Sequence, residues 1–172
     1  TYGIYANHSK LTIQDIQCER QKYDGIRMIE NGHLLLSNAT FKHAAQYGLA
    51  SEYCTLSIEH SQFMHNQNGL YTKGATVTMN DSQIAQSAHS GIEALSSSFN
   101  LIDTLFSYNA GTQFDATRST LQLQNTFFNH GKHALVLRNK VNATFNNVTC
   151  TDHTDTTICA DQSSIIGKKC LF

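Results

Sequence analysis

The stretch GLYTKGATVTMNDSQI (Gly69–Ile84) decides the fold, because its pattern returns 22 residues later as GIEALSSSFNLIDTLF (Gly91–Phe106). Each copy has a glycine and an aliphatic residue, then an apolar-polar-apolar triplet, then an aspartate and a bulky apolar residue. The bulky column recurs at spacings of 21 to 23 residues, at Cys18, Phe41, Phe63, Ile84, Phe106, Phe128 and Cys150. A period in this range predicts a solenoid in which each coil buries its apolar face only against its neighbours.

The residues within one repeat follow strand periodicity. Apolar and polar residues alternate, as in Leu56-Ser57-Ile58 and Leu121-Gln122-Leu123, and no sustained helical stripe is present. Equivalent residues recur in the same chain direction, so the strands are expected to pair in parallel, with equivalent residues stacked about 4.8 Å apart. The glycine column also stacks, and its members are Gly3, Gly25, Gly48, Gly69 and Gly91, followed by Gln113 and Ala134.

The repeat pattern Gly-Ile/Leu, then Leu-x-Ile/Leu-x-Asn/Asp-x-x-Phe, resembles that of right-handed parallel β-helix proteins of the pectate-lyase-like type. The resemblance covers about residues 3–150 and implies an all-β, right-handed parallel β-helix of about seven coils. We expect residues 1–150 to form the coils and residues 151–172 to form a C-terminal capping tail. Leucine-rich repeats, the main rival solenoid, need a helical segment in each unit. Lyases, hydrolases, epimerases, adhesins and inert spacers share the β-helix, so the fold alone selects no function.

The composition limits the classes of partner that the chain is expected to bind. The chain has 12 basic and 13 acidic residues and a net charge of −1, so no basic stripe predicts nucleic-acid binding. No run of 18 apolar residues predicts a membrane span. Thr1 leads directly into the first coil, which suggests cleavage before residue 1, a longer natural chain or a trimmed cap. Neighbouring segments or subunits are therefore expected partners for stacking on this uncapped N-terminal end.

Three of five Asn-x-Ser/Thr sequons are predicted glycosylation sites. Asn7, Asn80 and Asn142 lie beside inward apolar positions and should point outward, where a secretory pathway can modify them. Asn38 and Asn147 belong to the small polar column three residues before the bulky column. Such ladder residues commonly bond to the neighbouring coil, which makes these two poorer sites.

The cysteines divide into two groups. We interpret Cys18 and Cys54 as small buried hydrophobic residues, whereas one pair among Cys150, Cys159 and Cys170 is expected to form a disulfide. No histidine motif with metal-ligand spacing is present, so no cofactor is predicted. Ca²⁺ binding at the turns that carry aspartates is an alternative that the sequence leaves open, although the chain lacks a DxDxDG-type loop.

One outward face carries the most varied chemistry. Alternation places Glu93 and Asp115 in stacked positions, about 5 Å apart at the backbone. Two close carboxylates raise each other's proton affinity, which suits general acid and base roles at a glycosidic bond. Tyr71 and Lys73 lie one coil before this pair and Arg138 one coil beyond it, so the five residues are candidates for a saccharide groove. The plain alternative is a solvated charged ladder.

Three functions remain open on these grounds. The leading hypothesis is a secreted or cell-surface β-helix module, either alone or as part of a larger extracellular protein or filament, with a structural or carbohydrate-binding role. The alternative is a polysaccharide-active lyase, hydrolase or epimerase that uses Glu93 and Asp115. The third is ice binding through a ladder of hydroxyl side chains, which His33, Leu35, Asn100 and Gln122 interrupt.

Overall fold

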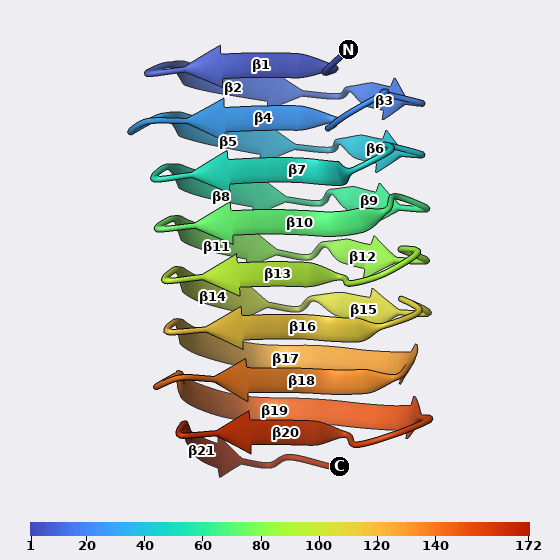
Figure 1. Ribbon diagram of the computed structural model, residues 1–172, viewed down its shortest axis with the longest axis vertical. Helices are drawn as coiled ribbons and strands as arrows, with labels where there is room; N and C mark the ends of the chain where they lie inside the picture. The colour runs from blue at the N-terminus through green and yellow to red at the C-terminus, as the bar shows by residue number, and fades with distance from the viewer.

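The computed structural model describes all of residues 1–172 and is a parallel β-helix of eight coils without any α-helix. The coils stack along one axis, with the N-terminus at one end and the C-terminus at the other (Figure 1). No helix is present that could cross a membrane. The predicted all-β solenoid is confirmed, and the chain forms eight coils where about seven were expected.

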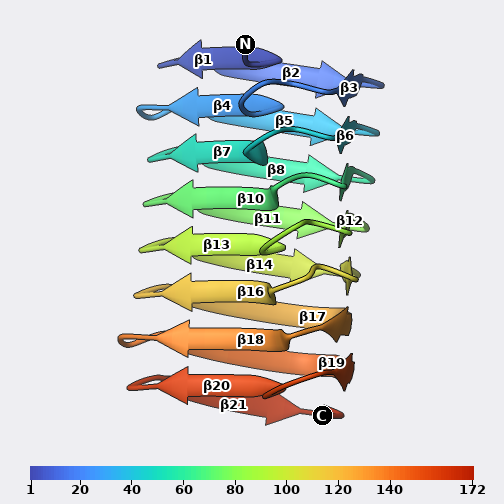
Figure 2. The same ribbon diagram turned by 45° about the vertical axis from the view of Figure 1, so that its right-hand side comes forward.

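Sheet A consists of the strands that begin each coil, all parallel (Figure 2). Its strands, in spatial order, are β1 (Ile4–Asn7), β4 (Ile26–Ile29), β7 (Tyr47–Glu52), β10 (Asn68–Lys73), β13 (Ile92–Leu95), β16 (Thr112–Thr117), β18 (His133–Arg138) and β20 (Ile158–Asp161). The spatial order follows the chain order, because each coil adds one strand beside the previous one.

Sheet B consists of the other two strands of each coil. The first limb is β2 (Lys10–Gln14), β5 (His33–Ser37), β8 (Thr55–Glu59), β11 (Thr76–Asn80) and β14 (Ser98–Ile102). The second limb is β3 (Gln17–Glu19), β6 (Thr40–Lys42), β9 (Gln62–Met64), β12 (Gln83–Ala85) and β15 (Leu105–Ser107). The limbs merge in the long strands β17 (Thr120–Gly131) and β19 (Asn142–His153), and β21 (Ser164–Lys168) pairs with β19.

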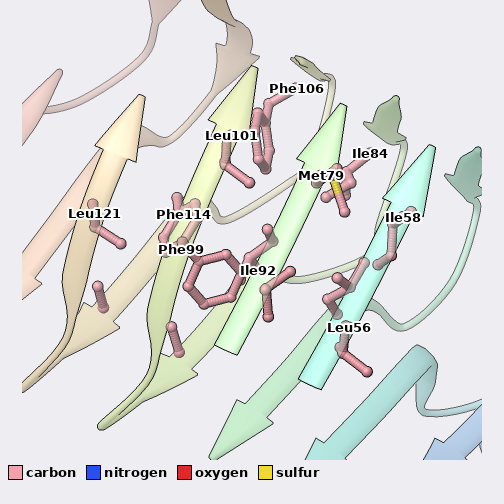
Figure 3. Close-up of a cluster of buried hydrophobic side chains, with 14 of the residues drawn as sticks. Leu56, Ile58, Met79, Ile84, Ile92, Phe99, Leu101, Phe106, Phe114 and Leu121 are labelled. Carbon is pink, nitrogen blue, oxygen red and sulfur yellow. The ribbon is translucent and has the colours of Figure 1, made fainter. Parts of the chain in front are cut away.

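The bulky column of the sequence forms one side of a continuous interior. Phe41 and Phe63 are fully buried and stack with ring centroids 5.4 Å apart, and Phe106 and Phe128 stack at 4.7 Å. Phe114 of sheet A packs against Phe106, with ring centroids 6.1 Å apart, and against Phe99, at 4.9 Å, and the three rings belong to the buried cluster in Figure 3. The core therefore runs the length of the axis, and no coil has a separate core.

The small polar column marks a turn. Every member from Asp15 to Asn147 has a φ between 44° and 57°, a left-handed conformation that Asn and Asp tolerate better than most residues. These side chains are exposed, so the aspartates of the column are solvated. Asn38 Nδ2 donates to Asp15 Oδ1 at 3.1 Å, and Asn147 Nδ2 donates to Asn125 Oδ1 at 2.9 Å. Both ladder asparagines thus bond to the neighbouring coil, as expected.

The glycine column is required by close packing between coils. A Cβ atom on Gly69 would overlap the backbone oxygen of Gly91, and one on Gly48 would lie 2.9 Å from the oxygen of Gly69. Coil six departs from this rule because Gln113 replaces the glycine. Its buried Nε2 donates to the carbonyl oxygens of Asn129 and His130, at 3.1 and 2.8 Å. Space for it comes from Gly131, where a Cβ would lie 2.5 Å from that nitrogen.

The predicted disulfide is not formed, since all five cysteines are free thiols. Cys159 lies in register with Val136 on sheet A and is exposed, whereas Cys150 is buried in register with Phe128. The Cys159 side chain therefore faces solvent, whereas the Cys150 side chain faces the interior of the coil. Cys170 packs against the core, and burial, with a further contribution from Cys170, raises the pKa of Cys150 to about 12.

Replacing Gly69 by alanine should destabilise the solenoid. The new methyl group meets a backbone oxygen that cannot move without shifting a whole coil, so we expect a loss of about 1–3 kcal/mol in the free energy of unfolding. Urea unfolding followed by circular dichroism measures it. Gly167→Ala is the matched control, because its nearest neighbour is the Cys170 sulfur at 3.4 Å. Equal stability of the two variants would contradict the packing argument.

Candidate functional site

The outward face of sheet A brings the predicted carboxylates together. Glu93 of β13 is in register with Asp115 of β16, and Tyr71 of β10 precedes Glu93 in the same column. Arg138 of β18 belongs to the neighbouring column, beside Thr117. Strand alternation and the 22-residue period therefore place four candidate residues on adjacent coils, as the sequence predicts.

A shallow groove lies over these strands. It has a volume of about 240 Å³ and is lined by Tyr71, Glu93, Ala94, Leu95, Asp115, Thr117 and Arg138. Lys73, the fifth candidate, does not line this groove. Its Nζ lies 3.8 Å from Glu52 Oε2 and 5.6 Å from the centroid of the Tyr53 ring, on the side of the preceding coils.

Glu93 is held by a residue that the sequence analysis missed. The hydroxyl of Tyr47 donates to Glu93 Oε2 at 3.4 Å across two coils, and the Tyr47 and Tyr71 rings lie 5.3 Å apart. Tyr47 precedes the glycine of its coil, outside the alternating columns, so periodicity gave no signal for it. Burial raises the pKa of Glu93, and the charge of Asp115 raises it further, while the Tyr47 hydrogen bond lowers it.

Asp115 is engaged differently from Glu93. Arg138 Nη1 donates to both carboxylate oxygens of Asp115, at 2.6 and 2.7 Å. The two stacked carboxylates therefore have distinct surroundings, because Glu93 is half-buried beside a phenol and Asp115 is paired with a guanidinium. Environments that separate two carboxyl groups in this way are typical of acid and base pairs, and also of ligand-binding ladders.

A buried aspartate anchors the first part of the same face. Asp24 is fully buried, accepts from Arg27 Nε at 2.8 Å and from the backbone N–H of Tyr47 at 3.1 Å. Arg27 Nη1 lies 3.6 Å from Glu52 Oε1, so the network continues to Lys73. Buried charges are stable only when paired, and this one fixes both Arg27 and the strand that carries Tyr47.

A second cavity lies over coils one to three of sheet A. Its volume is about 340 Å³, and Tyr2, Tyr5, Arg27, Glu52 and Tyr53 are among its lining residues. The Tyr2 and Tyr5 rings lie 5.6 Å apart, and the Arg27 guanidinium lies 6.0 Å from the Tyr2 ring centroid. Tyr5 and Arg27 share the outward column of Tyr71, whereas Tyr2 precedes β1 and Tyr53 lies in the bend after β7, where strand alternation gives no signal.

The other sequence-predicted features fall on separate surfaces. The hydroxyl ladder of sheet B is in register from Thr55 through Thr76 and Ser98 to Thr120. Asn7 and Asn142 are exposed and Asn80 is partly exposed, so all three sequon side chains reach the surface. No group of three or more His, Cys, Asp or Glu side chains is placed to hold a metal ion.

The raised pKa of Glu93 can be measured by carbon NMR titration of its side-chain carboxyl. We expect a value above the ordinary value of glutamate, because burial disfavours the charged form. Asp115→Asn should lower this pKa, since it removes a negative neighbour. Tyr47→Phe should raise it further, since it removes a hydrogen bond to the carboxylate. Opposite shifts in the two variants would contradict the geometry.

Comparison with known proteins agrees with the architecture. The sequence matches the family described as "Right handed beta helix region" over residues 2–114 and 68–172. No curated protein sequence matches the chain. The crystal structure of a double mutant of the periplasmic alginate epimerase AlgG superimposes with a TM-score of 0.79 and 11% identity, over 99% of this chain and 48% of that one. A second crystal structure of AlgG gives a TM-score of 0.61 at 11% identity, over 96% and 47%. The chain thus spans about half the length of these structures, and it belongs to the right-handed β-helix family.

Proposed function

We propose that sheet A binds a saccharide chain, with the groove between Tyr71 and Arg138 as the central contact. The observation that carries this proposal is the position of one aromatic ring beside three charged side chains in an open groove. Ligand sites usually combine apolar lining with a few convergent polar groups. A sugar ring offers both kinds of surface, because its C–H face is apolar and its hydroxyl groups donate and accept hydrogen bonds.

The individual contacts fit that chemistry. Tyrosine supplies a rigid amphipathic surface at low entropic cost, and Tyr71 is itself supported by the ring of Tyr47. The carboxylates of Glu93 and Asp115 can accept from sugar hydroxyls, and the free guanidinium edge of Arg138 can donate. Coils of 21 to 23 residues leave the groove without long walls, which favours binding over enclosure for chemistry.

The similarity of the fold to that of AlgG also supports the proposal of saccharide binding. The superimposed protein is named as a periplasmic alginate epimerase, which acts on a polysaccharide. We extend to this chain only a polysaccharide-related role and an extracytoplasmic location. The surface position of Asn7, Asn80 and Asn142 agrees with a secreted or cell-surface protein that carries glycans.

Tyr71→Ala tests the binding proposal. Affinity electrophoresis of the full chain in gels that contain soluble polysaccharides should identify a glycan that retards the wild type. Loss of the Tyr71 ring should then weaken retardation about ten-fold, as expected for an aromatic anchor. Tyr108→Ala is the matched control, because Tyr108 is exposed and lies outside both sheet A cavities. Equal retardation of the Tyr71 variant and the wild type would contradict this site.

A second candidate function is acid and base catalysis on the same saccharide. The raised pKa of Glu93 favours it, because a carboxyl that keeps its proton to higher pH can protonate a glycosidic oxygen. Asp115, which Arg138 holds in place, would then serve as the carboxylate partner.

Degradation or epimerisation assays on polysaccharides separate this candidate from binding alone. If Glu93 is the acid, activity falls as the pH rises through its raised pKa, because only the protonated form donates. Glu93→Gln and Asp115→Asn should each abolish turnover while leaving the circular dichroism spectrum unchanged. Wild-type activity in either variant would remove that residue from the mechanism.

A further inference from the structure

The cations of sheet A are all paired with carboxylates of the protein itself. The strands of this sheet contain three Lys or Arg residues: Arg27, Lys73 and Arg138. Arg27 contacts Asp24 at 2.8 Å and Glu52 at 3.6 Å, Lys73 lies 3.8 Å from Glu52, and Arg138 lies 2.6 Å from Asp115. Arg118 and Lys140, in the turns after β16 and β18, line neither cavity. No cation in either cavity is left unpaired for a ligand carboxylate.

The same face has an excess of negative charge. Its strands carry four outward carboxylates, at Glu52, Glu93, Asp115 and Asp161, against those three cations. A sugar acid would have to displace a protein carboxylate from its partner, and would then face the remaining ones at close range. Like charges brought together without a free counter-ion oppose binding. Hydroxyl groups meet no such barrier, because they can add hydrogen bonds to ions that are already paired.

The groove beside Tyr71 and the second cavity beside Tyr5, together called the two cavities, lie along one line parallel to the solenoid axis. Tyr5 and Tyr71 occupy the same outward column three coils apart, which is roughly 15 Å at the usual strand spacing. Tyr5 and Tyr53 are 54% and 52% exposed, so their rings remain available for contact. Between the cavities, Lys73 lies over Tyr53 and pairs with Glu52. A chain longer than a disaccharide is needed to reach both.

From these observations we infer that the ligand of sheet A is an uncharged glycan chain that lies along the solenoid axis and contacts both cavities. The inference rests on the proposed saccharide-binding function and specifies its ligand class and footprint. The cavity around Tyr5 and Tyr53 then acts as a second subsite. Linking two weak contacts in one chain raises the overall affinity well above that of either contact.

Calorimetric titration of the full chain with short glycans tests the ligand class. The probes are the neutral hexasaccharides of glucose, xylose and mannose in β-1,4 linkage, their disaccharides, and hexamers of mannuronate and galacturonate. At least one neutral hexamer should bind about ten-fold more tightly than both uronate hexamers and its own disaccharide. A uronate hexamer that binds more tightly than every neutral one would overturn the inference. If no probe binds at all, the proposed function fails instead.

Variants test the footprint and the charge argument separately. Tyr5→Ala should weaken the neutral hexamer several-fold and leave the disaccharide unchanged, whereas Tyr71→Ala should weaken both. Equal hexamer affinity of Tyr5→Ala and the wild type would remove the second subsite. Asp115→Asn releases Arg138, so affinity for the uronate hexamers should rise about ten-fold. Glu59→Gln on sheet B makes the same change in net charge and should have no effect. No gain in Asp115→Asn would overturn the charge argument.

Discussion

In-register parallel hydrogen bonding between successive coils is the constraint on which the rest of the structure depends. Gly25, Gly69 and Gly91 illustrate it, since each donates its backbone N–H to a carbonyl oxygen of the next coil. Because the register never slips, residues 22 positions apart become neighbours about 4.8 Å away. Residues that recur with this period therefore form a row of stacked side chains in the structure, whether the row is buried, at a turn or on an outer face.

The constraint can be satisfied by more than one sequence. Most coils use a glycine where the chain passes close to its neighbour, because a Cβ atom would strike a carbonyl oxygen. In coil six, Gln113 takes the place of the glycine, and Gly131 leaves the space that the longer side chain needs. Two hydrogen bonds from the Gln113 Nε2 satisfy the buried amide. Such exchanges preserve the coil spacing, and the outer columns that carry the candidate site stay aligned.

On sheet A, the same alignment determines the electrostatics. Stacked coils place charged residues within reach of one another, so Arg138 pairs with Asp115 and Lys73 pairs with Glu52. The buried Asp24 holds Arg27 from below the surface. A face organised in this way is rich in charge yet offers no unpaired cation in its cavities. We therefore propose that it binds hydroxyl-rich ligands, and burial beside Tyr47 raises the pKa of the Glu93 carboxyl.

The sequence by itself determined the fold, the strand register and the adjacency of Glu93 and Asp115, because those follow from a period and an alternation. It also placed Asn7, Asn80 and Asn142 at positions that reach the surface. It did not reveal Tyr47, Tyr2 or Tyr53, which lie in or beside turns, where no period says in which direction a side chain extends. The contact of Lys73 with the Tyr53 ring and the burial of Asp24 were decided only in the tertiary structure. A long side chain can reach several neighbours, and the contact that forms depends on distances and burial that a linear pattern does not contain.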